Sequence, residues 1–239
     1  MATIPKENIL FIDIETAPQF AHFSGVPEKV QHLWEEKVTR QRILKENETL
    51  PESYDKAGLF AEFGKIICIV AGFFEKETFQ LRSFSGDDEK KLLIEFSDFL
   101  EKFIQHRKSS EKQLCAHNGK EFDYPYIARR MLINKVPIPN ILDNGGKKPW
   151  EVALIDTLEL WKFGDYKAFT SLNLLAHIFG LPSPKQELDG SKVGTTYWDK
   201  NDLASIVKYC CTDVVTLANV YLCLKGQEPF KENIVVYKP

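Results

Sequence analysis

The sequence lacks the features that mark several special classes of protein. Its five cysteines include no Cys-x-x-Cys pair, so they predict buried thiols in a reducing compartment rather than a zinc or disulfide framework. It contains no uninterrupted apolar run of the length that a membrane span needs, and residues 1–6 do not form a signal-peptide pattern. We therefore expect a cytoplasmic protein without a membrane partner.

Charge and composition also lack any extreme. The 239 residues carry a net charge of -3, and 44% are hydrophobic and 27% charged, as in an ordinary globular protein. This net charge gives no global attraction to nucleic acid, although a local basic groove remains compatible with it. Because the chain shows no repeat, low-complexity block or linker, we expect residues 1–239 to form a single domain.

The apolar pattern predicts an α/β fold with a central mixed β-sheet flanked by helices. Strands are expected at residues 8–14, 65–74, 78–84, 113–117 and 152–155, and helices from Asp87 or Asp88 to about 103 and at about 124–133, 171–179 and 201–224. Residues 19–60 break the pattern, and Val30, Trp34 and Val38 recur there at helical spacing. We expect a helical insertion after the first strand, close to the site that it follows.

Two acids stand at the end of the first predicted strand. Asp13 and Glu15 are two residues apart, and residues i and i+2 of a strand project from the same face. The two carboxylates repel each other unless a cation neutralises them, and hard oxygen ligands favour Mg²⁺ or Mn²⁺. From these two residues alone, a strand-ending Asp13 with a solvated Glu15 is an equal alternative.

Two further acids occupy comparable positions. Asp123 begins a predicted helix after the turn Asn118-Gly119, which suits a positive φ angle, and an N-cap role is an alternative for it. Asp213 follows Tyr209 by four residues, so the two side chains share one face of the last helix. A hydrogen bond between them at a solvated edge is the plain alternative. One metal-filled pocket would explain all four acids.

Several other polar residues have roles that the sequence leaves open. Asp156 is interpreted as a helix cap rather than a further acid of the site, and His117 as a buried, hydrogen-bonded histidine. Arg129 and Arg130 contact either phosphates or water. The basic and aromatic stretch 147–150 is either a patch for single-stranded nucleic acid or a solvated loop.

Three segments together resemble the motifs of the DEDD superfamily of 3′–5′ exonucleases. Asp13-x-Glu15 is similar to the first motif. The run Asn118-Gly-x-x-Phe-Asp123-x-Pro-Tyr is similar to the second, especially in the proofreading exonuclease of family B DNA polymerases. The third, Tyr209-x-x-x-Asp213, resembles the tyrosine subclass (DEDDy). Residues 61–66 and 171–177 also resemble stand-alone bacterial exonucleases of the polymerase-B-like kind.

The resemblance implies a ribonuclease H-like fold and two-metal-ion hydrolysis of phosphodiester bonds at a 3′ end, with release of nucleoside 5′-monophosphates. It implies that Asp13, Glu15, Asp123 and Asp213 bind two divalent ions, Mg²⁺ or Mn²⁺. Asp13 would bridge the ions, Glu15 and Asp213 would complete the ion that activates water, and Asp123 would help to hold the ion beside the leaving oxygen.

The same resemblance implies how substrate is handled. Tyr209 would orient the attacking water, while Thr16 and Asn118 would hold the terminal nucleotide. The expected partners are 3′ ends of single-stranded DNA or RNA, together with possible DNA replication or repair proteins. Two alternatives remain: a non-catalytic nucleic-acid-binding module built on a nuclease scaffold, and a proofreading subunit that acts only with a polymerase.

Overall fold

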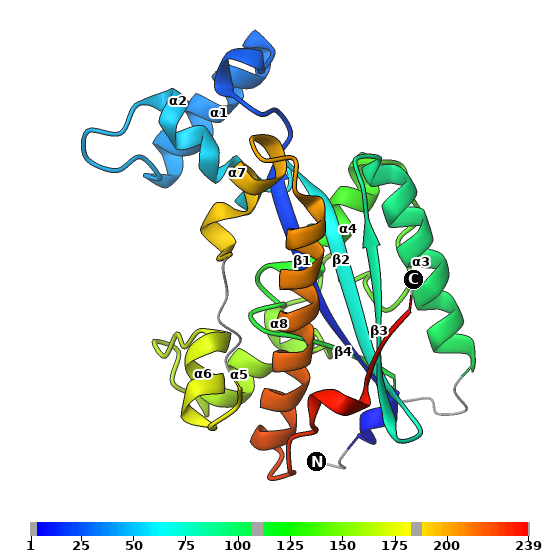
Figure 1. The fold of residues 1–239 in the computed structure, drawn as a ribbon. Helices are drawn as coiled ribbons and strands as arrows, with labels where there is room; N and C mark the ends of the chain where they lie inside the picture. Colours follow the sequence, from blue (N-terminus) through cyan, green and yellow to red (C-terminus); the bar gives the residue numbers. More distant parts are fainter. Residues whose placement is uncertain (1–3, 107–111, 183–187, 239) are drawn as a thin grey trace.

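One mixed sheet forms the centre of the molecule (Figure 1). The computed structural model describes residues 4–106, 112–182 and 188–238. Within these residues the strands are β1 Ile9–Pro18, β2 Gly64–Glu75, β3 Thr78–Ser85, β4 Gln113–Ala116, β5 Ile155–Asp156 and β6 Val235–Lys238. They lie in the order β5-β4-β1-β2-β3-β6. β2 pairs antiparallel with β1 and β3, and the other neighbours are parallel.

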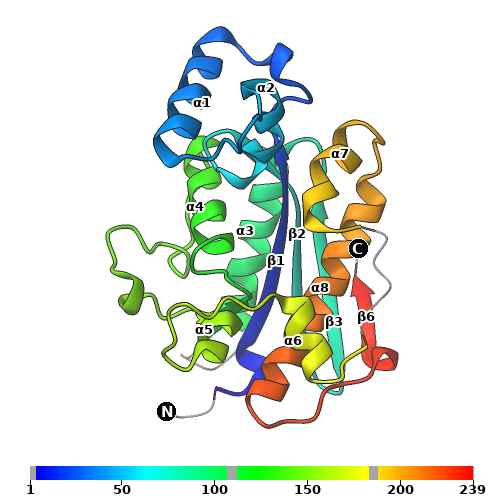
Figure 2. The same cartoon turned by 90° about the vertical axis from the view of Figure 1, so that its left-hand side faces the viewer.

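Helices cover both faces of this sheet. The α-helices of the described residues are α1 Glu28–Gln41, α2 Leu50–Ser53, α3 Glu89–His106, α4 Asp123–Ile133, α5 Thr157–Lys162, α6 Leu172–Ile178, α7 Val193–Trp198 and α8 Leu203–Leu224. Short 3-10 helices lie at Lys6–Asn8, Phe23–Gly25, Tyr54–Leu59, Pro149–Glu151, Gly190–Lys192 and Glu232–Ile234. Helices α3 and α4 cover one face and α8 the other (Figures 1 and 2). The predicted mixed α/β sheet is confirmed.

Strand β1 runs through the middle of the sheet and is apolar on both faces. Leu10, Ile12 and Ile14 pack in the core beneath α3 and α4, whereas Ile9 and Phe11 pack in the core beneath α8. Because side chains alternate along a strand, residues 13 and 15 share the face of Phe11. Both acids of β1 are therefore on the side of the sheet that α8 covers.

Helix α8 is long and apolar enough to cross a membrane if only length and composition are considered. Of its most apolar window, 61% is buried inside the protein. Ile206, Val214 and Leu217 lie in the core against the sheet. This packing accounts for the apolar composition, since the core helix of a layered α/β protein needs an apolar face.

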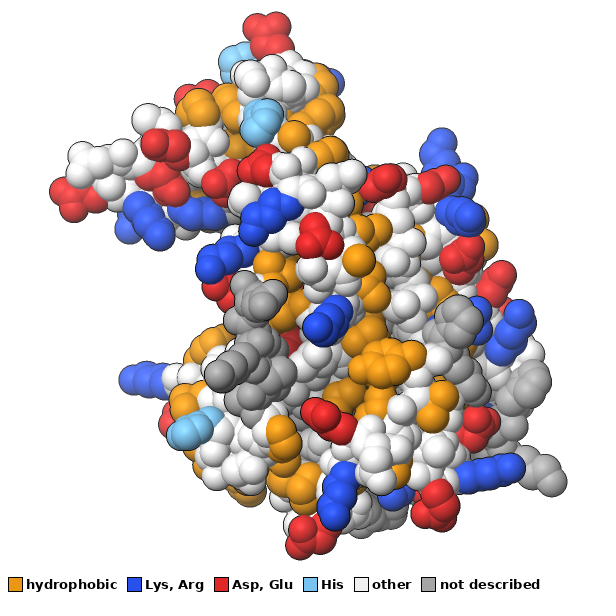
Figure 3. All heavy atoms as spheres, viewed as in Figure 1, with side chains coloured by type: hydrophobic (Ala, Val, Ile, Leu, Met, Phe, Trp, Pro, Cys, Tyr) orange, Lys and Arg blue, Asp and Glu red, His pale blue; other side chains and the backbone are white. Residues whose placement is uncertain are grey.

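The segment between β1 and β2 forms a lobe with a small core of its own. Trp34, Val38 and Tyr54 are buried in it, and the Trp34 indole N–H donates to Ser53 Oγ over 3.0 Å. The lobe joins the sheet at Gly58, whose carbonyl accepts hydrogen bonds from Thr16 Oγ1 at 2.7 Å and from the Tyr126 hydroxyl at 2.8 Å. Figure 3 shows the molecule hollowed between this lobe and the region of α5 and α6.

Four elements differ from the sequence prediction. The strand expected at 152–155 is displaced, because β5 is only the pair Ile155–Asp156, which matches Cys115 and Ala116 of the short β4. Helix α7 was not expected, and α5 was implied only by the cap role of Asp156, since six residues are too few to show a helical period. β1 continues beyond residue 14 because β2 remains paired to it up to Pro18, across a register shift after Glu15.

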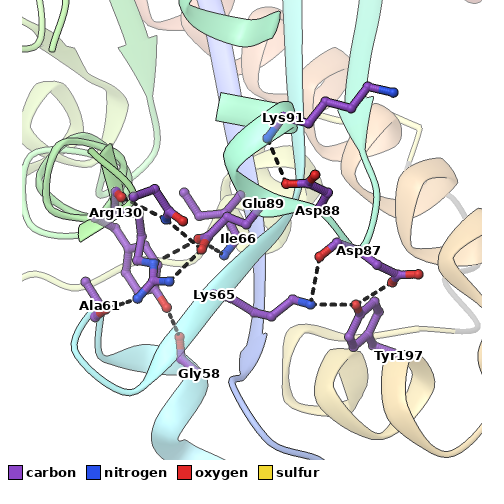
Figure 4. Close-up of polar contacts among 12 residues, drawn as sticks. Gly58, Ala61, Lys65, Ile66, Asp87, Asp88, Glu89, Lys91, Arg130 and Tyr197 are labelled. Carbon is purple, nitrogen blue, oxygen red and sulfur yellow. Dashed lines mark hydrogen bonds and ion pairs between the residues drawn. The ribbon is translucent and has the colours of Figure 1, made fainter. Parts of the chain in front are cut away.

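A buried ion pair ties α3 and α4 to the start of β2 (Figure 4). Glu89 accepts from Arg130 Nε at 2.8 Å and from the backbone N–H of Ile66 at 2.7 Å. Arg130 also donates to the carbonyl oxygen of Ala61 over 2.8 Å. The expectation that Arg130 contacts phosphates or water is wrong, because this guanidinium is bound to Glu89 inside the protein.

Candidate active site

The acids of β1 lie where the strand loses one of its neighbours. The ladder between β1 and β4 covers only Ile9–Phe11, whereas pairing with β2 continues along the strand. Asp13 is half-buried and Glu15 is 8% exposed. Their carboxylate oxygens and the sulfur of Cys210 on α8 lie within 4.8 Å of one another. The same-face prediction for the two acids is thus consistent with their close approach.

Asp123 contacts β1 beyond the residues that pair with β4. It is the first residue of α4, and only 4% of it is exposed. Its carboxylate accepts hydrogen bonds from its own backbone N–H and from that of Ile14. A buried strand N–H without a ladder partner needs an acceptor, and Asp123 supplies one. Phe122, not Asp123, occupies the N-cap position, so the capping alternative does not describe this residue.

Helix α8 brings Tyr209 and Asp213 to the same place. Their side chains are hydrogen-bonded, as the spacing of four residues predicts. Burial raises the pKa of the Tyr209 phenol, and the nearby charges of Asp213 and Glu15 raise it further. The phenol therefore stays protonated at neutral pH and donates to the carboxylate.

Burial and neighbouring negative charges raise the pKa values of Asp13, Glu15 and Asp123. Burial raises the pKa of Asp13 well above its ordinary value, and the charges of the other three acids raise it further. Burial and the charge of Asp213 raise the pKa of Glu15. Burial raises the pKa of Asp123 to about 7. Each of these three acids is thus harder to ionise in the fold than in water.

Among the described residues, three of these acids form no ion pair with a basic side chain. None of the ion pairs among residues 4–106, 112–182 and 188–238 involves Asp13, Glu15 or Asp123. Buried carboxylates without a basic partner are costly unless a bound cation compensates them. Their oxygen donors suit a hard divalent ion such as Mg²⁺ or Mn²⁺. The residues present therefore fit the metal ions that the resemblance implies.

Cys210 is a site neighbour that the sequence analysis did not select. Its thiol donates to Asp13 Oδ2 over 3.2 Å. Burial raises the pKa of this thiol well above its ordinary value, so it remains a donor rather than a thiolate ligand. The signal available in the sequence was its position on the buried stripe of α8, three residues before Asp213. Its prediction as a buried thiol is confirmed.

Asp156 organises the loop that leads to Asp123. Its carboxylate caps α5 by accepting from Leu158 N at 2.9 Å, as the sequence predicts. It also accepts from the backbone N–H groups of Asn118 at 2.9 Å and Lys120 at 3.0 Å. These bonds fix Asn118 at a φ of 59°, in the left-handed region. Asp156 is therefore a positioning residue for the segment that presents Asp123.

The residues expected to hold a nucleotide are Thr16 on β1 and Asn118 in the loop before α4. Thr16 follows Glu15 on β1 and donates to the Gly58 carbonyl, which leaves its oxygen lone pairs as acceptors. Asn118 is half-buried, and its backbone is used in the loop. Trp150 is exposed, with Lys148 Nζ 5.3 Å from the centre of its ring. Substrate contacts by Thr16 and Asn118 stay predictions.

The sheet, its flanking helices and the acids of β1, α4 and α8 define an α/β protein of ribonuclease H-like fold with a carboxylate-rich site. Residues 59–229 match a protein-family model. That family is described as a predicted 3′–5′ exonuclease related to the exonuclease domain of PolB, the family B DNA polymerase. The chain belongs to this family. The matched range includes Asp123, Tyr209 and Asp213 and begins after Asp13 and Glu15.

A solved structure shows the same fold. The family B DNA polymerase from the hyperthermophilic archaeon Pyrobaculum calidifontis aligns with 92% of this chain at a TM-score of 0.50 and 16% sequence identity. The alignment covers 26% of the polymerase, so this chain corresponds to about a quarter of that protein. A search of the curated proteins finds none that matches the sequence.

Proposed function

We propose that this protein is a metal-dependent 3′–5′ exonuclease that removes nucleoside 5′-monophosphates from single-stranded DNA or RNA. The observation that carries the proposal is the cluster of mutually repelling carboxylates from β1, α4 and α8. Three of them, Asp13, Glu15 and Asp123, have raised pKa values and form no ion pair among the described residues. Membership of a family of predicted exonucleases supports the same reading.

Each acid and Tyr209 has a defined task in this proposal. Asp13, Glu15, Asp123 and Asp213 hold two divalent ions, Mg²⁺ or Mn²⁺. Such ions, when bound, lower the pKa of an attacking water and stabilise the leaving 3′ oxygen. The Tyr209 hydroxyl orients the attacking water. Its raised pKa excludes it as the general base, because a protonated phenol cannot accept that proton.

Labelled oligonucleotides test the proposal. Incubation with Mn²⁺ is expected to shorten a 5′-labelled single strand into a descending ladder, and to release a labelled mononucleotide at once from a 3′-labelled strand. A chelator should stop both reactions. Products shortened from the 5′ end would refute the assigned polarity, and activity that persists in the chelator would refute the metal requirement.

The same assay separates the alternatives. A non-catalytic binding module would retain oligonucleotides without turnover, and its affinity would not change with chelator. A proofreading subunit would act only after addition of a polymerase with which it co-purifies. The four acids are all present and interact with one another, which argues against the non-catalytic module, whereas the co-purification test decides the proofreading alternative.

Replacement of Tyr209 by phenylalanine is expected to lower kcat by about 10- to 100-fold with little change in KM, because one hydrogen bond that positions water is lost. The variant should unfold at nearly the wild-type temperature, since the ring is kept. Tyr237→Phe, in which an exposed tyrosine on β6 loses its hydroxyl, is the matched control and should keep the wild-type kcat. A wild-type kcat for Tyr209→Phe would remove this residue from the reaction.

Metal binding is expected to strengthen as pH rises through about 7. Raised pKa values mean that the folded, metal-free protein binds more protons than the unfolded chain between about pH 4 and pH 7, so its stability falls over that window as pH increases. Mn²⁺ must displace those protons. Saturating Mn²⁺ should raise Tm by roughly 5–10 °C at pH 8 and by much less at pH 5.5. Equal shifts at both values would contradict the raised carboxylate pKa values.

A further inference from the structure

Residues 163–169, here called the aromatic turn, present three aromatic rings to solvent. Phe163 is 88% exposed, Tyr166 is 95% exposed and Phe169 is 70% exposed. Aromatic side chains normally supply buried area, so three exposed rings within seven residues indicate a surface that meets a partner. The turn lies between α5 and α6, outside the acid cluster.

Hydrogen bonds give the aromatic turn a defined shape. The backbone N–H of Asp165 donates to the Lys162 carbonyl over 2.8 Å, and the Asp165 carboxylate accepts from Lys167 N at 3.0 Å. Phe163 ends α5 with a φ of 44°, an unusual angle for a bulky side chain. Gly164 follows with a φ of 91°. The backbone thus bends where two successive positive φ angles push the Phe163 ring outward, instead of burying it.

The turn is anchored to the active-site segment. His117 lies one residue before Asn118, and its Nε2 donates to the Thr170 carbonyl over 2.9 Å. Its Nδ1 accepts from the Thr157 hydroxyl at 2.9 Å, and burial lowers the pKa of the imidazole, which keeps it neutral. Both ends of the α5–turn unit are therefore connected to the loop that presents Asp123. In Figure 2 the segment between α5 and α6 crosses in front of β1.

The charges around the rings fit a nucleic acid better than a protein. Lys162 precedes the turn and the exposed Lys167 lies within it, and the Asp165 carboxylate accepts a hydrogen bond from the Lys167 backbone N–H. Protein-docking patches have apolar centres depleted of lysine and aspartate, whereas single-strand surfaces combine lysines with separate aromatic rings. Every base offers a π-face, so rings on a basic turn bind unpaired nucleotides without reading their sequence.

We propose that the aromatic turn is a stacking surface for unpaired bases, on which the nucleotides 5′ of the scissile bond lie. This inference rests on the proposed exonuclease function only for the direction of the strand. Phe163, Tyr166 and Phe169 hold bases and the two lysines hold phosphates. The acids alone act on the last phosphodiester, so the turn sets affinity for longer strands and plays no part in bond cleavage.

A triple replacement Phe163→Ala/Tyr166→Ala/Phe169→Ala tests the proposal by binding. An oligothymidylate of roughly 16 nucleotides, titrated in an Asp13→Asn background to prevent cleavage, should bind at least tenfold more weakly, because each stacked base contributes roughly 5- to 150-fold. Phe163→Tyr/Phe169→Tyr, which keeps the rings, should bind as the parent does. Tyr237→Ala removes an exposed ring from β6 and is the matched control.

A small substrate separates this proposal from the proposed function. The p-nitrophenyl ester of thymidine 5′-monophosphate has one base and should be hydrolysed at the same rate by the triple variant and the wild type. If the wild type cleaves nothing but binds oligothymidylate through the turn, the exonuclease proposal fails and this one stands. Unchanged oligothymidylate affinity in the triple variant, or no binding by the wild type, would overturn it. A changed oligomeric state with unchanged affinity would overturn it too, in favour of a protein interface.

Discussion

Asp13→Asn is expected to lower the exonuclease rate by about 10³-fold or more. Asp13 is repelled by the three other acids, and its carboxylate oxygens lie within 4.8 Å of those of Glu15. Asp13 therefore interacts electrostatically with each of the other three acids. Asparagine keeps the size of the side chain but lacks the negative charge and one of the two oxygen ligands, so metal binding and turnover are lost together.

Affinity and stability distinguish this result from misfolding. In the absence of metal, Asp13→Asn should bind oligothymidylate at least as well as the wild type, because one negative charge near the phosphates is gone. Its metal-free form should be more stable at pH 8 by roughly 1–3 kcal/mol, since a buried repulsion is relieved. Asp98→Asn, an exposed acid on α3 at the opposite face of the sheet, is the matched control and should have wild-type activity. A rate for Asp13→Asn within tenfold of the wild type would exclude it from the reaction.

Arg130→Met is expected to destabilise the protein by roughly 3–5 kcal/mol. The change leaves Glu89 charged and buried after loss of both guanidinium contacts, and it orphans the Ala61 carbonyl. Equilibrium unfolding in urea measures the difference. The adjacent Arg129 is exposed, so Arg129→Met changes the same kind of residue without touching the pair and should cost less than about 1 kcal/mol.

A second substitution at Glu89, the partner of Arg130, tests whether the ion pair itself causes this loss of stability. In Arg130→Met/Glu89→Gln no buried charge remains, and the amide oxygen of the substituted side chain on α3 still accepts from the Ile66 N–H. The double variant should therefore be more stable than Arg130→Met alone. A double variant that is less stable than either single one would show that the ion pair is not what Arg130 contributes.

The sequence predicted those parts of the site that depend on local spacing. Asp13 and Glu15 share a face because strands alternate, and Tyr209 meets Asp213 because helices repeat every 3.6 residues. Their positions in the fold agree with both rules. The long strands and helices were predicted for the same reason, since each carries enough apolar residues to show a period.

Features that depend on tertiary contacts could not be predicted. The thiol of Cys210 reaches Asp13 only because α8 packs across β1, and nothing in either segment alone indicates that contact. The pairing of Arg130 with Glu89 joins residues that are 41 apart in the chain. The exposure of Phe163 and Tyr166 was equally hidden, because an aromatic residue in a sequence is expected in the core.

The central claim is that Asp13, Glu15, Asp123 and Asp213 grip two divalent ions at the 3′ end of a nucleic acid. A crystal structure with Mn²⁺ and a nucleoside 5′-monophosphate tests it most directly, because manganese is located by its anomalous scattering. We predict two manganese peaks among these carboxylates, with Asp13 between them and the phosphate alongside. Manganese bound elsewhere, or carboxylates that remain without a cation at saturating Mn²⁺, would contradict the account.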